Sequence, residues 1–118
     1  METKLDKFTE AYIACLLWAE TDDNQEPLDS HYKVSDIATE ALHTIIEDCV
    51  NFQVANKGLL RDLDESQCGH DFWLTRHGHG SGFWDRGLGE IGETLSQKAH
   101  EFGSCDPYIG DDGKLYLS

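Results

Sequence analysis

The residues best suited to chemistry in this 118-residue chain lie in one segment, from His70 to Arg86. Imidazole and carboxylate groups can move protons or bind metal ions, and guanidinium groups bind phosphate and carboxylate. Such side chains are denser here than a simple turn needs, and tryptophans and glycines lie between them. The candidate site residues are His70, Asp71, Arg76, His77, His79, Asp85 and Arg86.

One interpretation of this segment is a metal site. His77 and His79 are two residues apart, so on a β-strand both imidazoles would point to one side. His70, Cys68 or Asp85 would then complete a zinc site, which needs three or four protein ligands. The sequence offers no second ligand pair at a recognisable spacing. We therefore predict neither a metal ion nor another cofactor, and we expect the histidines at a solvated turn.

A second interpretation is a phosphate cradle. Gly78, Gly80 and Gly82 would expose backbone N–H groups while Arg76 and Arg86 supply positive charge. The glycine spacing differs from the dinucleotide-binding fingerprint, and a strand instead of a helix is expected to follow it. A hairpin turn that needs positive φ explains the same glycines.

Two β-hairpins are expected. The aromatic and β-branched stretch Asp71–Arg76 predicts a strand, and Gly82–Arg86 predicts its returning partner after the glycine-rich turn. The second hairpin is predicted from Pro107–Ile109 and Lys114–Leu117, which flank a turn-rich link.

Three helices are expected around these hairpins. Apolar residues at helical spacing predict them over 5–20, from an N-cap at Ser35 to about Lys57, and over 88–102. The resulting order is α-α-β-β-α-β-β. We therefore predict one α+β domain over residues 1–118, with three helices packed on a small antiparallel sheet of three to four strands.

The charge of the chain restricts its partners. There are 23 acidic and 9 basic residues, which gives a formal net charge of −14. This charge repels phosphate, so direct binding to nucleic acid or to an anionic membrane is not expected. Fifteen acidic and five basic residues precede Cys68, and the negative charge therefore belongs mainly to the front half.

The cellular compartment is predicted from the absence of membrane-spanning and export signals and from the pattern of the cysteines. No apolar run approaches the roughly 20 residues that cross a bilayer, and the N-terminus lacks the pattern of an export signal. The four cysteines form no CxxC motif. We expect free, mostly buried thiols in a reducing cytoplasm.

The stretch Gly69–Arg86, with Asp111–Tyr116 downstream, resembles a family of small proteins encoded by bacteriophages and prophages, which share the pattern HDFWLTRxGHGxGFWDR. The resemblance covers roughly the C-terminal half and implies a phage-encoded protein that acts in a bacterial host cell. In that pattern the place of His77 is often Asn, which argues against a catalytic or metal role for His77. The shorter stretch Leu74–Gly78 resembles the Arg-His-Gly signature of the histidine phosphatases, but that family implies a much larger α/β domain.

We interpret the chain as an acidic accessory protein that binds a host protein with a basic surface and inhibits a nucleic-acid-handling or defence complex, of the anti-CRISPR or anti-restriction type. The alternative is a small metal- or phosphate-binding enzyme, or a nucleotide-binding protein, that uses the His70–Arg86 segment. A homodimer or other homo-oligomeric module is a third interpretation, and solubility alone would also explain the acidity. The expected partner-binding residues are Glu20, Asp22, Asp23, Glu26, Asp29, Glu47 and Asp48.

Overall fold

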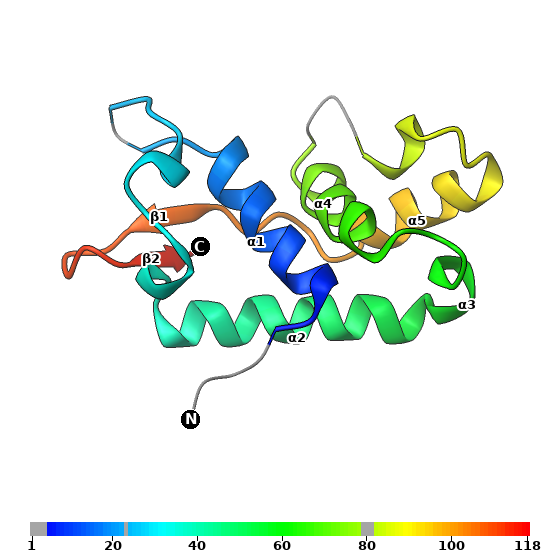
Figure 1. Ribbon diagram of the computed structural model, residues 1–118, viewed down its shortest axis with the longest axis horizontal. Coiled ribbons are helices and arrows are strands. Elements are labelled where there is room, and N and C mark those ends of the chain that lie inside the picture. The colour runs from blue at the N-terminus through cyan, green and yellow to red at the C-terminus, as the bar shows by residue number, and fades with distance from the viewer. Residues whose placement is uncertain (1–4, 23, 79–81) are drawn as a thin grey trace.

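The computed structural model describes residues 5–22, 24–78 and 82–118, and regular structure in these ranges is mostly helical (Figure 1). Within them the only sheet is one antiparallel pair of short strands, so the predicted α+β fold with three to four strands is wrong. The elements are α1 (Lys7–Ala19), η1 (Leu28–Ser30), η2 (Val34–Asp36), α2 (Thr39–Ala55), α3 (Lys57–Leu60), α4 (Glu65–Arg76), η3 (Phe83–Asp85), α5 (Glu90–His100), β1 (Pro107–Ile109) and β2 (Leu115–Leu117), where η marks a 3₁₀ helix.

The three predicted helices are present as α1, α2 and α5. Asp6 caps α1, because its carboxylate accepts a hydrogen bond from the Thr9 N–H at 2.7 Å. The predicted N-cap of α2 is wrong, since Ser35 lies inside η2 and the helix begins only at Thr39. The N–H of Ala38 instead donates to the carbonyl of Leu115 at 2.9 Å, so a contact with β2 fixes the start of α2.

The stretch Asp71–Arg76, predicted as a strand, is the C-terminal half of α4. Asp64 caps this helix by accepting the Gln67 N–H at 2.8 Å. Every residue of the stretch is buried, so this half of the helix has no solvent-exposed face that would mark a helical period in the sequence. Aromatic and β-branched residues suit a buried central helix as well as a strand, and composition alone favoured the strand.

The predicted returning strand is also wrong, because Phe83–Asp85 forms η3. A Cβ on Gly82 would lie 2.2 Å from the Thr75 Oγ1, and the N–H of Phe83 donates to that oxygen at 3.1 Å. Glycine therefore lets the chain return in close contact with α4. The residues between, 79–81, lie outside the described ranges.

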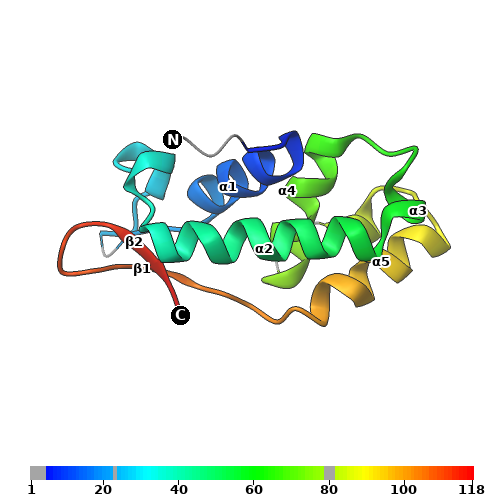
Figure 2. The ribbon, with the colours of Figure 1, turned by 90° about the horizontal axis from the view of Figure 1, so that it is seen from below.

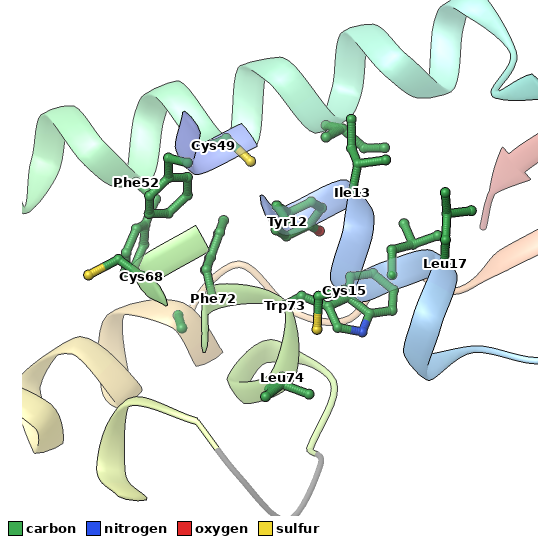
Figure 3. Packing of buried hydrophobic residues seen from close by; sticks show 14 of the residues in the cluster. Tyr12, Ile13, Cys15, Leu17, Cys49, Phe52, Cys68, Phe72, Trp73 and Leu74 are labelled. Atoms are coloured by element: carbon green, nitrogen blue, oxygen red, sulfur yellow. The ribbon is translucent and has the colours of Figure 1, made fainter. Parts of the chain in front are cut away.

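α1 and α4 cross with their backbones in contact at Gly69. A Cβ on this residue would lie 2.0 Å from the carbonyl oxygen of Phe8. Figure 2 shows the long helix α2 running across this pair. The crossing brings buried aromatic rings of three helices together, and Phe52 of α2 stacks on Phe72 of α4 with ring centroids 4.2 Å apart (Figure 3).

The predicted C-terminal hairpin is confirmed. β1 and β2 pair in antiparallel register, with Tyr108 opposite Tyr116. Leu115 is buried and anchors the hairpin beside α2, while Tyr108 is exposed. Among the described helices, none combines the length and the apolar composition that a bilayer crossing requires.

Candidate functional site

Arg76, a candidate for phosphate binding, is a buried structural residue. Its guanidinium donates to the Tyr12 hydroxyl at 3.0 Å and to the Asp48 carboxylate at 3.0 Å. It also donates to the carbonyl oxygens of Gly103 at 2.7 Å and Phe102 at 3.2 Å. Most of the donors of the guanidinium are therefore used inside the protein, and the group is closed to a phosphate ligand.

Asp71 and Arg86 form a close ion pair between α4 and the end of η3. The Arg86 Nε lies 3.1 and 3.2 Å from the two carboxylate oxygens of Asp71, and its Nη2 lies 2.8 Å from Oδ1. Gln67 donates a further hydrogen bond to Oδ1 at 3.1 Å. Only 1% of Asp71 is exposed, so its carboxylate is inaccessible to a substrate and holds η3 on the helix.

His77 is held by both ring nitrogens at the end of α4. Its Nδ1 lies 2.9 Å from the Trp73 carbonyl oxygen, and the Cys105 N–H donates to Nε2 at 3.0 Å. These two contacts fit the neutral ring with its hydrogen on Nδ1. The ring also stacks on Trp73 with centroids 3.5 Å apart. His77 therefore has no nitrogen left for a metal ion, and His79, its predicted partner, lies outside the described residues.

Acidification is expected to destabilise the protein through His77. Burial lowers its pKa in the folded state below the value of about 6.5 in an unfolded chain. As the pH falls through the unfolded value, the unfolded state takes up more protons than the folded state, so the free energy of unfolding decreases. Urea unfolding at about pH 7.5 and 5 should show a smaller decrease in His77→Gln than in the wild type.

The exposed His43 supplies the control for this measurement. His43→Gln should show the same decrease in the free energy of unfolding as the wild type, because the His43 imidazole is exposed and not held in a buried contact. If His77→Gln and the wild type lost the same free energy on acidification, the assignment of a buried neutral imidazole would be wrong.

Cys15 and His70 lie close together but do not form a reactive pair. The Cys15 Sγ is 3.9 Å from the His70 Nε2. Burial, with smaller contributions from Asp71 and Glu20, raises the pKa of the thiol to about 12. A nucleophilic cysteine needs the opposite shift and an accessible sulfur. All four cysteines are free, as predicted, and three of them are buried.

Among the described residues, three of the predicted partner-binding residues, Asp22, Glu26 and Asp29, lie on the connection between α1 and α2. Asp22 organises it, because its carboxylate accepts the N–H groups of Asn24 at 2.8 Å and Glu26 at 3.0 Å. Glu26 and Asp29 are exposed, and Asp23 lies outside the described residues. The Glu26 carboxylate accepts a hydrogen bond from the His31 ring, which raises the pKa of His31.

Asp22, Glu26 and His31 also bring one ligand atom each within 4.8 Å of one another. They lie at or near the surface, where acidic groups gather without a metal ion, and Glu26 already contacts His31. We therefore assign no metal to this group.

The remaining predicted partner-binding residues lie on helices or at their ends. Glu47 is exposed on α2, and Glu20 is the C-terminal cap of α1. Asp48 is half-buried, and its carboxylate binds Arg76. Its role in the protein is thus at least partly internal, whereas Glu47 can meet a partner.

The structure contains a groove that the sequence did not indicate. It has a volume of about 430 Å³ and lies between the start of α1, the end of α2, α3 and the start of α4. Val54, which is 71% exposed, lies at its edge with the cationic residues Lys57 and Arg61. Two exposed valines on α2, Val50 and Val54, lie four residues apart and outside its apolar stripe. They were the feature of the sequence that could have indicated this groove. The lining residues are Phe8, Gln53, Val54, Lys57, Leu60, Arg61, Leu63, Glu65 and Cys68.

Comparison with known proteins adds no functional assignment: no protein-family model, no curated protein and no solved structure matches the chain.

Proposed function

We propose that this chain is a binding protein whose exposed carboxylates dock on the basic surface of a host protein and keep nucleic acid away from it. The observation that carries the proposal is a contrast between two sets of polar groups. Arg76, His77 and the Asp71–Arg86 pair are occupied by internal contacts. Most of the described carboxylates, by contrast, are exposed to solvent.

The surface retains the whole net charge of the chain. The internal pairs Arg76–Asp48 and Arg86–Asp71 each combine one positive and one negative charge. The remaining charged groups therefore still have a formal net charge of −14. A surface of this sign attracts and orients a basic protein during encounter. Proteins that handle nucleic acid carry such basic surfaces, because they neutralise phosphates with lysine and arginine.

The resemblance of Gly69–Arg86 to phage and prophage proteins supports a bacterial cytoplasm as the setting. In that setting the basic partner would be a restriction or CRISPR complex, and the chain would act as its inhibitor by competing with the nucleic acid. The alternative of an enzyme built on the same segment is not favoured, since Arg76, His77 and the Asp71–Arg86 pair are engaged in structural contacts.

Charge reversal on the connection between α1 and α2 tests this proposal. Glu26→Lys combined with Asp29→Lys should weaken inhibition of DNA cleavage by a purified CRISPR or restriction complex by about tenfold at low salt. The difference from the wild type should shrink as salt is added, because exposed charges are screened. The measurement is the inhibitor concentration that halves the cleavage rate, at two salt concentrations.

The matched control carries the same change in net charge elsewhere. Asp62→Lys with Asp111→Lys reverses two exposed carboxylates in turns far from this connection in the sequence. It should reduce inhibition much less, and circular dichroism should show that both double variants are folded. Wild-type protein that inhibits none of a panel of such complexes would refute the proposed function.

A further inference from the structure

Trp18 exposes 61% of its surface, although tryptophan is among the residues that are most buried on average. It lies in the last turn of α1, whose other large apolar side chains point into the core. Trp73 is fully buried by comparison, and Trp84 exposes 54% on η3. An exposed indole on a regular helix is a feature of binding surfaces, where tryptophan contributes strongly to affinity.

The Trp18 ring is supported from one side by His70. The two rings are tilted by 34° with centroids 5.9 Å apart. His70 is half-buried on α4, and burial lowers its pKa, so the imidazole is neutral near pH 7 and does not itself act as a cation for the indole. The indole is thus a supported platform that still offers most of its surface to an incoming group.

Carboxylates lie next to this platform in the chain. The connection from α1 folds back on the end of the helix, because the Leu28 N–H donates to the Glu20 carbonyl at 2.9 Å and Thr21 bridges to Pro27. Figure 1 shows this connection beside the C-terminal end of α1. The exposed carboxylates of Glu26 and Asp29 are therefore carried by the same local unit as Trp18.

We propose that Trp18 receives an arginine side chain of the basic partner protein, with the guanidinium stacked on the indole and its N–H groups directed to nearby carboxylates. An exposed aromatic face on a chain with a formal net charge of −14 is complementary to a cation. Arginine fits better than lysine, because its guanidinium is planar, stacks on aromatic rings and is more weakly hydrated. This inference rests on the proposed function and specifies the group of the partner that is recognised.

Binding of oligoarginine and oligolysine peptides of equal length provides the test. The wild type should bind oligoarginine more tightly than oligolysine, as measured by fluorescence anisotropy of labelled peptides. Trp18→Leu should weaken oligoarginine binding by about two- to fivefold, the range expected for an exposed cation–π contact. Its effect on oligolysine should be smaller, so the preference for arginine should fall.

Trp84→Leu is the matched control, because Trp84 is similarly exposed and has a carboxylate beside it in Asp85. This variant should keep the wild-type preference for oligoarginine. An unchanged preference in Trp18→Leu, or an equal loss in Trp84→Leu, would overturn the role of Trp18. The proposed function would still stand in that case if Glu26→Lys with Asp29→Lys weakened the binding of both peptides. Failure of both peptides to bind the wild type at low salt would instead count against the proposed function itself.

Discussion

Replacement of Arg76 by alanine is expected to lower the free energy of unfolding by about 3–5 kcal/mol, the range for breaking a buried ion pair from one side. The change removes a side chain that is almost fully buried and leaves the Asp48 carboxylate, the Tyr12 hydroxyl and the Gly103 carbonyl without their donor. Domains of this size have a total stability of about 5–15 kcal/mol, so the loss would leave little margin. Urea unfolding followed by circular dichroism measures it.

Two further variants make this expectation specific to the guanidinium. Arg76→Lys should recover only a small part of the lost free energy of unfolding, because one ammonium group cannot reach all the acceptors that surround the planar guanidinium. Arg61→Ala removes an arginine whose side chain is 80% exposed, and its effect should stay within about 0.5 kcal/mol. Equal stability of the two alanine variants would show that the Arg76 contacts contribute nothing.

Replacement of Gly69 by alanine is expected to cost about 3 kcal/mol or more, at the upper end of what overpacking causes. The added methyl group would overlap the backbone carbonyl of Phe8, and neither helix can yield without moving the aromatic residues between them. α1 and α4 must therefore separate along their crossing. The midpoint of thermal unfolding should fall by about 10 °C or more, since about 1 kcal/mol corresponds to roughly 4 °C in a domain of 118 residues.

Gly58→Ala is the control for the substitution itself. Gly58 lies in α3, and a Cβ there would meet no atom within 4 Å. Alanine should leave the stability unchanged or raise it by up to about 1 kcal/mol, because glycine is a poor helix former. A Gly69→Ala variant as stable as Gly58→Ala would contradict the close crossing of α1 and α4.

The elements that the sequence predicts correctly are those with one buried face. α1, α2 and α5 each show apolar residues at helical spacing, and the C-terminal hairpin has clear turn residues between its strands. α4 was mistaken for a strand because its second half is enclosed on all sides. Whether such a stretch is helical depends on neighbours such as Phe8 and Phe52, which are distant in the sequence, and local patterns do not contain that information.

The segment His70–Arg86 is rich in polar side chains, but residue types could not reveal what these groups bind. Arg76 is matched by Asp48 and by carbonyls after α5, and His77 is matched by the backbone of Cys105. Catalytic sites and internal networks use the same side chains, and only the location of their partners separates them. The groove beside Val54 was missed for a related reason, since four segments contribute to it.

The contacts that hold the chain after α5 are made to its main chain. Arg76 binds the carbonyls of Phe102 and Gly103, and His77 accepts the N–H of Cys105. Recognition of this kind does not depend on which side chains stand at Ser104 and Cys105, so these positions can accept many amino acids. It does depend on the spacing between anchored peptide groups. A single inserted or deleted residue would shift these peptide groups out of reach. This short tract therefore tolerates many substitutions but not a change in its length.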